Sequence, residues 1–232
     1  MEKRLPQLDA RLACAAALVR EGQAAADIGC DHGKLTAYLA AGGRCPRVIG
    51  TDLRPAPLAR ARQTLERAGL AQRTELRLGD GLSVLAPGEV GTIIVAGVSA
   101  QTTIDMLAAA PWIFDPQGPR LVLVPATKHA VLRAWLAQNG FALLRDCPVQ
   151  AAGRWYAVMA AEYTGRREAE PSLADCLYGK TGSEPGGAAY AALQRGRLRR
   201  CRIGLAPDSA EARRIDAFLA AEEQPAPAEK QQ

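Results

Sequence analysis

Three carboxylates early in the chain stand where chemistry on a nucleoside-bearing ligand could be arranged: Asp27, Asp52 and Asp80. Each closes a short apolar run, and glycines follow or flank Asp27 and Asp80. Because the carboxyl ends of parallel strands meet at one edge of a sheet, we expect the three side chains to lie close together. A carboxylate about twenty residues beyond a glycine turn is placed to accept hydrogen bonds from both hydroxyls of a ribose. The sequence therefore predicts a site for a nucleoside-bearing cofactor.

The glycine turn after the first apolar run separates two classes of cofactor. Dinucleotide-binding turns follow the pattern G-x-G-x-x-G, whereas here Gly29 and Gly33 enclose a segment with Asp31 at its centre. A carboxylate at this position would repel a pyrophosphate but would attract the sulfonium and ammonium groups of S-adenosylmethionine. We therefore expect S-adenosylmethionine as the cofactor. The alternative is that both glycines serve only a strand-to-helix turn.

The elements that must position these residues follow from apolar periodicity. Strands are expected at 24–29, 47–52, 74–79, 92–97 and 120–125. Helices are expected at 5–20, 33–42, 55–68, 101–110 and 128–138. Two further strands, 141–149 and 154–164, are expected to form a hairpin around Gly153 at the sheet edge. The pattern predicts an α/β protein with a doubly wound, seven-stranded, Rossmann-like sheet, which is the strand count of class I methyltransferases.

After Thr164 the chain changes character. Residues 165–187 are polar and glycine-rich, and apolar residues then recur at helical spacing over 188–203 and 209–222. We therefore divide the chain into three parts: a methyltransferase domain over 1–164, a helical and possible coiled-coil C-terminal appendage over 165–222, and a disordered tail over 223–232. The two appendage helices would form an antiparallel pair.

The charge of the chain permits a polyanionic partner. The formal net charge is +5, and five arginines occur in the appendage with no acid among them: Arg195, Arg197, Arg199, Arg200 and Arg202. We interpret this arginine run as either a set of RNA phosphate contacts or a solvated helix face. If the run is only a solvated face, an RNA-binding role would rest on basic residues around the sheet, such as Arg11, Arg54 and Arg133.

Composition also excludes several classes of protein. No apolar run is long enough to span a bilayer, and the N-terminus leads into an amphipathic segment, so we expect a cytoplasmic protein with no membrane partner. The six cysteines form no C-x-x-C pair, and neither histidine stands at metal-ligand spacing, so we expect reduced thiols and no metal site. The sequence does not distinguish a monomer from a homodimer.

Several motifs occur in an order that resembles one known family, the bacterial tRNA (adenine-22-N1) methyltransferases. They are Leu8-x-x-Arg11-Leu12, Ala26-Asp27-Ile28-Gly29-Cys30-Asp31-His32, Arg77-Leu78-Gly79-Asp80-Gly81-Leu82, Val95-Ala96-Gly97, Leu132-Arg133-x-Trp135-Leu136-x-x-Asn139-Gly140 and the strand around Tyr156. The resemblance spans roughly residues 5–163, and members of the family carry a helical C-terminal part.

This resemblance implies methyl transfer from S-adenosylmethionine to N1 of an adenine in tRNA. It implies that Asp27, Gly29, Cys30, Asp31 and His32 hold the methionine end of the cofactor. It also implies that Asp52 with Leu53 binds the ribose, and that Asp80, between Gly79 and Gly81, meets the adenine. Ala96 and Gly97 complete the expected cofactor set. Asp31 is the candidate catalytic carboxylate, although a role in holding the cofactor is equally compatible with its position.

Two turns depart from the family pattern at the edge where the target base should enter. The chain has Val98-Ser99-Ala100 where the family typically has Met-Gly-Gly, and Val124-Pro125-Ala126 where the family has Gln-Pro-Asn. Lost glycines restrict the approach of the backbone, and lost amides remove groups that can contact a base edge. Two alternatives therefore stay open: a diverged paralogue that binds S-adenosylmethionine or RNA without this activity, and a methyltransferase for another substrate.

Overall fold

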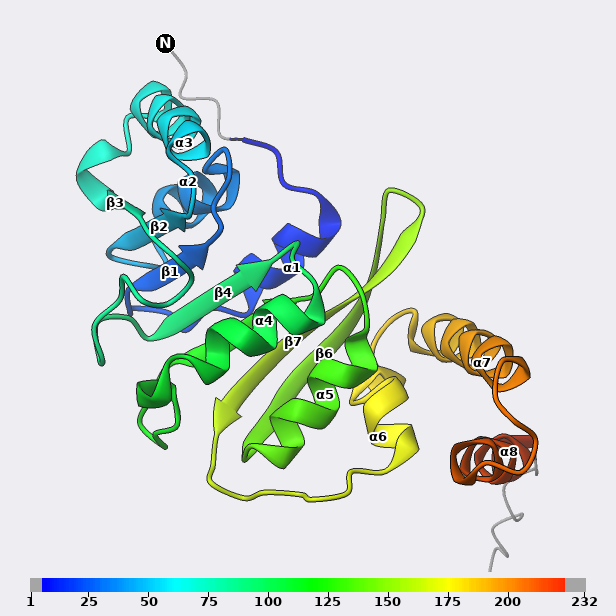
Figure 1. The fold of residues 1–232 in the computed structure, drawn as a ribbon. Helices are drawn as coiled ribbons and strands as arrows, with labels where there is room; N and C mark the ends of the chain where they lie inside the picture. The colour runs from blue at the N-terminus through cyan, green and yellow to red at the C-terminus, as the bar shows by residue number, and fades with distance from the viewer. Residues whose placement is uncertain (1–5, 224–232) are drawn as a thin grey trace, which may run out of the picture.

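The computed structural model describes residues 6–223 and contains one mixed sheet in the order β3-β2-β1-β4-β5-β7-β6 (Figure 1). The strands are β1 (Ala25–Ile28), β2 (Val48–Asp52), β3 (Thr74–Leu78), β4 (Thr92–Ala96), β5 (Arg120–Val124), β6 (Phe141–Ala151) and β7 (Arg154–Tyr163). Strands β1 to β5 are parallel, β7 is antiparallel to β5, and β6 is antiparallel to β7. The predicted doubly wound seven-stranded α/β fold is confirmed.

Helices cover both faces of the sheet, so the central strands are buried on both sides. Helices α1 (Ala10–Ala17), α2 (Lys34–Ala41) and α3 (Pro55–Ala68) pack on one face, and α4 (Ala100–Ala108) and α5 (His129–Gln138) pack on the other. Successive side chains alternate between the two cores: Ile93 and Val95 join α4 and α5, whereas Ile94 joins α1 and α2. This explains why the central strands have continuous apolar sequences.

Helix α1 is shorter than the helix expected over 5–20. Within the described residues it begins at Ala10, because the Asp9 side chain caps it by accepting a hydrogen bond from the Leu12 N–H at 3.0 Å. It ends at Ala17. Apolar spacing continues beyond both ends, but spacing alone does not reveal where a cap stops a helix.

The β6–β7 hairpin brings a distant segment to the edge where the parallel strands end. Because β7 is antiparallel to β5, its first residue, Arg154, lies at the edge where β5 ends. The turn residues Ala152 and Gly153 have φ values of 47° and 72°, as expected for a tight two-residue hairpin. The predicted hairpin around Gly153 is confirmed, although β6 extends to Ala151.

The C-terminal appendage is helical, as predicted, and packs against α5. It contains α6 (Leu173–Tyr178), α7 (Gly187–Ile203) and α8 (Ala210–Glu223). Leu177, Leu198 and Ile215, one from each helix, form a small apolar cluster that also contacts Ala130 of α5. The sequence did not predict α6, which Ser172 caps. The expected tail, apart from Glu223 at the end of α8, lies outside the described residues.

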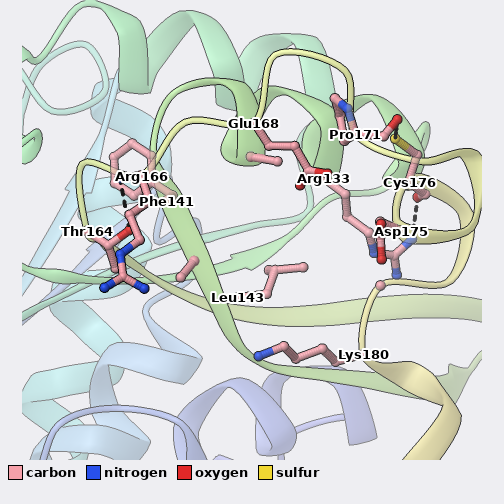
Figure 2. A pocket seen from close by; sticks show the side chains of 13 residues that line it. Arg133, Phe141, Leu143, Thr164, Arg166, Glu168, Pro171, Asp175, Cys176 and Lys180 are labelled. Atoms are coloured by element: carbon pink, nitrogen blue, oxygen red, sulfur yellow. Dashed lines mark hydrogen bonds between the residues drawn. The ribbon is translucent and has the colours of Figure 1, made fainter.

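A buried ion pair attaches this appendage to the sheet. Nε of Arg133 donates to Oδ2 of Asp146 at 2.7 Å, and Nη1 donates to the backbone oxygens of Cys176 and Leu177 at 3.1 and 2.9 Å. Figure 2 shows Arg133 beside the α6 segment, at a cavity of about 640 Å³. The Arg133 side chain is 1% exposed, so the prediction that Arg133 could contact RNA is wrong.

The cavity in Figure 2 is remote from the edge where the parallel strands end. It is lined by Phe141, at the start of β6, and by Thr164, just after the end of β7. Both positions lie at the amino edge of the parallel strands, because the hairpin tip lies at the carboxyl edge. The predicted site residues are therefore found elsewhere.

Candidate cofactor site at the carboxyl edge of the sheet

A cavity of about 770 Å³ lies at the carboxyl ends of β1 to β4. The strand order reverses between β1 and β4, and ligands of doubly wound sheets bind at such a switch point. All residues of the expected cofactor set line this cavity: Asp27, Gly29, Cys30, Asp31, His32, Asp52, Leu53, Gly79, Asp80, Gly81, Ala96 and Gly97. The tertiary structure therefore brings together residues that are spread over three βα units and the end of β4.

The turn between β1 and α2 follows the cavity wall with a tightly constrained backbone. Gly29, Asp31 and Gly33 have φ values of 71°, 49° and 69°, the left-handed region that glycine adopts without strain. A Cβ on Gly33 would lie 2.9 Å from Cβ of Ala61 in α3. Gly33 therefore has both a conformational and a packing reason to be glycine, and α2 can begin directly at the cavity with its free N–H groups.

Asp27 forms a buried acidic wall of the cavity. The Thr36 hydroxyl donates to Oδ2 of Asp27 at 2.7 Å. Burial raises the pKa of Asp27 from 3.8 to about 6, although the Thr36 hydrogen bond acts in the opposite direction. No cation among the described residues forms an ion pair with this carboxylate. Asp27 is therefore an ionisable group that a cationic ligand would stabilise in its charged form.

Asp52, at the end of β2, is held by backbone hydrogen bonds. Its Oδ2 accepts from the Asp31 N–H at 3.3 Å, and its Oδ1 accepts from the Arg54 N–H at 2.9 Å. The residue is 7% exposed. The carboxylate therefore has a fixed orientation and reaches the cavity, as a ligand for adjacent hydroxyl groups requires.

Asp31 is exposed and His32 is partly exposed at this turn. The Asp31 side chain is 67% exposed, and its Oδ1 lies 3.6 Å from Nε2 of His32. Arg60 of α3 lies with Nη1 at 3.1 Å from the same His32 nitrogen. Because a guanidinium can only donate, Nε2 accepts this hydrogen bond. His32 thus helps to hold the turn against α3.

The loop after β3 closes the side of the cavity where Asp80 lies. A Cβ on Gly79 would lie 2.1 Å from Cγ1 of Val84, and one on Gly81 would lie 3.0 Å from Cγ of Met106. Both glycines therefore allow the loop to pack closely. Asp80 is exposed at the cavity rim.

Arg77 of the Arg77–Leu82 motif has a structural role in the same loop. Its Nε donates to Oε1 of Glu75 at 2.7 Å, and its Nη1 donates to the backbone oxygen of Val84 at 2.6 Å. Nη1 also donates to Oε2 of Glu89 at 2.8 Å. Arg77 therefore ties the loop that carries Asp80 to the edge strand β3.

The segment around α1 supplies lining residues that the sequence analysis did not place in the site: Gln7, Asp9, Arg11 and Leu12. The Arg11 guanidinium lies 5.2 Å from the centre of the Tyr156 ring of β7. The motif Leu8-x-x-Arg11-Leu12 was the available signal, but its spacing did not reveal that the helix reaches across the sheet to this cavity. Lys34, Leu35, Thr51, Arg54, Val98 and Met106 were also missed as lining residues.

The departures from the family pattern have a local structural explanation. Ser99 caps α4 by accepting a hydrogen bond from the Thr102 N–H at 3.1 Å, and its φ of −67° suits any residue. Ala126 donates its N–H to the Val98 oxygen at 2.8 Å, so the two altered turns support each other. The substitutions therefore leave an intact backbone beside the cavity. His129 is the first residue of α5.

The arginine run is divided among different surroundings. Arg195 pairs with Glu222 at 3.3 Å, and Arg202 pairs with Asp216 at 2.8 Å, so acids from α8 neutralise two of the five residues. Arg197 lines a separate cavity at the carboxyl edge of the sheet. Arg199 and Arg200 are exposed on α7. The arginine run contains no acid, but two of its five side chains form ion pairs with acids of α8 in the folded protein.

Residues 6–223 carry neither a cluster of metal ligands nor a membrane-spanning helix. No group of three or more histidine, cysteine, aspartate or glutamate side chains in this part of the chain is arranged to hold a metal ion. None of the described helices is long and apolar enough to cross a membrane.

Comparison with known proteins places the chain in a family. Residues 8–159 match the methyltransferase domain family. A tRNA (adenine(22)-N(1))-methyltransferase of Bacillus subtilis (strain 168) is 30% identical over 163 residues, which cover 70% of this chain and 68% of the relative. The match therefore extends over most of both proteins.

Solved structures show the same fold. Sp1610 of Streptococcus pneumoniae, in complex with S-adenosyl-L-methionine, has a TM-score of 0.77 and 22% identity, and the match covers 92% of this chain and 100% of that one. M. capricolum TrmK, in complex with the natural cofactor product S-adenosyl-homocysteine, has a TM-score of 0.75 and 18% identity, with 92% and 95% coverage. On the sequence matches together with this fold, the chain belongs to the methyltransferase domain family and, within it, to the tRNA (adenine(22)-N(1))-methyltransferases.

Proposed function

We propose that this protein uses S-adenosylmethionine to methylate N1 of adenine 22 in tRNA, in the cytoplasm. The observation that carries the proposal is the cavity at the switch point of the sheet, which all the expected cofactor residues line. Family membership supports the reaction, because the Bacillus subtilis relative is a tRNA (adenine(22)-N(1))-methyltransferase.

The chemistry of the cavity fits this cofactor. Asp27 and Asp31 place carboxylates where a sulfonium and an ammonium group would be attracted, and the same charges disfavour a pyrophosphate. Asp52 presents a fixed carboxylate for the ribose hydroxyls. A Cβ placed on Gly29 would have no atom within 4 Å, so this side of the cavity is open for a ligand. Asp80, between Gly79 and Gly81 in the cavity lining, suits the adenine.

The residues of the chain would act mainly by orientation. When bound, S-adenosylmethionine supplies an electrophilic methyl group. The lone pair of adenine N1 lies in the plane of the ring, so transfer requires in-line placement more than a strong base. We propose that Asp31, the most exposed carboxylate of the turn, contacts the acceptor side of the site. Asp31→Asn should then lower kcat more than it weakens cofactor binding, measured by single-turnover kinetics and calorimetry.

The test of the proposed function uses a tRNA transcript made in vitro with adenine at position 22. The protein is incubated with this transcript and methyl-labelled S-adenosylmethionine, and the nucleosides are analysed by mass spectrometry. One equivalent of 1-methyladenosine is expected. A transcript with guanine at position 22 is the matched control and should remain unmethylated.

Other products would identify the alternatives. Methylation at another nucleotide would replace adenine 22 as the target. Binding of S-adenosylmethionine without methylation of any transcript would indicate a diverged binding protein and would refute the proposed reaction.

A further inference from the structure

A second cavity, of about 490 Å³, opens at the carboxyl edge between the β5–α5 turn, the β6–β7 hairpin and α7. Its lining residues are Ala126, Thr127, Lys128, His129, Gly153, Arg154, Trp155, Tyr156, Leu193 and Arg197. We call it the hairpin groove. Its volume is within the range of small-ligand sites, about 300–1,000 Å³. Three of the lining residues are cations and none is acidic, so the groove is suited to an anion.

The hairpin groove adjoins the cofactor cavity at two places. Val98 lines the cofactor cavity and accepts a hydrogen bond from the N–H of Ala126, which lines the groove, at 2.8 Å. Arg11 lines the cofactor cavity and lies over the ring of Tyr156, which lines the groove. A ligand in the groove would therefore lie beside the site proposed for the methyl donor.

The indole of Trp155 forms the aromatic part of the groove wall. Trp155 and Tyr156 are both half-buried at the start of β7, but their side chains lie on opposite faces of the sheet, Trp155 with the α4–α5 core and Tyr156 with the α1–α2 core. Trp155 packs edge-on against Tyr190 of α7, with ring centres 6.3 Å apart, and a Cβ on Gly186 would lie 2.8 Å from its ring. These contacts with Tyr190 and Gly186 therefore fix the position of the indole ring. A fixed aromatic ring beside cations is the combination with which proteins bind unstacked nucleotides.

The appendage supplies the third cation, and a buried contact fixes its position. Nδ1 of His129 lies 2.8 Å from the Tyr190 hydroxyl, and Arg133 donates to the same hydroxyl at 3.2 Å. These contacts join α7 to α5 and so place Arg197, further along α7 than Tyr190, at the groove. Within the described residues, no carboxylate pairs with Lys128, Arg154 or Arg197. Their charges are therefore available to a ligand.

We propose that the hairpin groove binds a nucleotide of the RNA substrate, with phosphates at Lys128, Arg154 and Arg197 and an unstacked base against Trp155. This inference rests on the proposed function, because it assigns the place where the RNA approaches the cofactor cavity. It assigns RNA contact to one member of the arginine run, Arg197. The two arginines that pair with acids of α8 are not part of the groove.

The charged half of the proposal is tested with the adenine-22 transcript. Its affinity for the wild type and for Arg154→Ala and Arg197→Ala variants is measured at several salt concentrations. Each variant should reduce the slope of log affinity against log salt by about 0.7–0.9 if one phosphate contact is lost. Arg200→Ala, an exposed arginine on the same helix, is the matched control and should leave the slope unchanged. S-adenosylmethionine affinity should stay the same in all variants.

The aromatic half is tested by Trp155→Phe and Trp155→Leu. Leucine removes the stacking surface and should weaken transcript binding by about fivefold to a hundredfold, while phenylalanine should restore most of it. A thermal unfolding scan checks that each variant folds. If Trp155→Leu is unstable, the salt slopes of the arginine variants still decide the proposal.

The outcomes separate this proposal from the proposed function. If the wild type methylates adenine 22 but the groove variants bind RNA with wild-type slopes and affinities, the groove assignment is overturned and the function stands. If the wild type neither binds nor methylates the transcript, both are refuted. Equal losses in Arg197→Ala and Arg200→Ala would assign binding to the whole face of α7 and would also overturn the groove.

Discussion

At the scale of single residues, the carboxylates of the cofactor cavity differ in how the fold holds them. Asp52 accepts two backbone N–H groups, which fix its orientation. Asp27 is buried with one hydroxyl partner, and burial raises its pKa. The first arrangement suits a hydrogen-bonding role toward neutral hydroxyls, and the second suits attraction of a cation. These differences lead to separate predictions.

Asp52→Ala should weaken S-adenosylmethionine binding by about 1.5–3 kcal/mol, the scale of a charge-assisted hydrogen bond. Isothermal titration calorimetry measures this change. Asp208→Ala, which removes an exposed carboxylate in the appendage, is the control and should bind like the wild type. An unchanged dissociation constant in folded Asp52→Ala would remove Asp52 from the site.

Asp27 should give cofactor binding and folding stability opposite pH dependences. Its pKa of about 6 in the folded protein lies above the unfolded value of 3.8. Between these two pH values the folded state binds more protons than the unfolded state. The contribution of Asp27 to folding stability therefore increases as pH falls and is lost as pH rises through 6. Cofactor affinity should fall over the same acidification, because protonation removes the charge that attracts a cation.

The comparison of wild type with Asp27→Asn isolates this effect from other titrating groups. Calorimetry over the range from about pH 5 to about pH 8 should show a step in cofactor affinity at about pH 6 in the wild type and no such step in the variant. Parallel pH profiles in the two proteins would show that Asp27 does not face the cofactor.

At the scale of elements, the first βα turn shows how local sequence and tertiary packing combine. Positive φ values predict glycine at several turns of the chain, but only some of these glycines also face a neighbouring element. Gly33 faces Ala61 of α3, whereas no atom lies within 4 Å of a Cβ placed on Gly43. The two positions therefore separate backbone strain from steric contact.

Gly43→Ala should cost about 1–2 kcal/mol of unfolding free energy, the strain of a left-handed alanine. Gly33→Ala should lower the unfolding free energy by about 1–3 kcal/mol more than Gly43→Ala does, because its new methyl group also overpacks against α3. Urea denaturation of both variants measures the difference. Equal destabilisation would mean that α3 moves away without cost.

At the scale of the whole molecule, the appendage is attached through buried polar contacts as well as the apolar cluster on α5. Arg133 joins α5, β6 and α6, and the hydroxyl of Tyr190 adds α7 to the same network. Both charged side chains of the ion pair are at most 1% exposed. Removing one partner leaves the other charge buried without compensation.

Arg133→Met should therefore destabilise the protein by about 3–5 kcal/mol, and adding Asp146→Leu should recover much of this loss. Denaturant unfolding measures stability, and limited proteolysis reports whether α6 to α8 detach. Arg145, on the same strand as Asp146, forms an exposed ion pair with Glu184, so Arg145→Met should have a much smaller effect. A small loss in Arg133→Met would show that the apolar cluster alone attaches the appendage.

Local sequence patterns predicted the sheet, its strand count and a set of residues that line one cavity. These features depend on period-two and helical spacing and on glycines and acids at strand ends, which are local patterns. A doubly wound sheet brings strand ends to one edge even when the bounds of individual elements shift by a few residues. For this reason, errors in the bounds of α1 and β6 did not disturb the site.

Features that depend on contacts between distant segments could not be predicted from local patterns and follow from how the chain folds. Arg133 is buried because α6, unseen in the sequence pattern, covers it, and Arg195 and Arg202 are paired because α8 folds back along α7. The hairpin groove unites residues from position 126 to position 197. The type of each side chain can be read from the sequence. Its burial and its partners depend on which distant surface packs against it, and residue spacing along the chain does not reveal that surface.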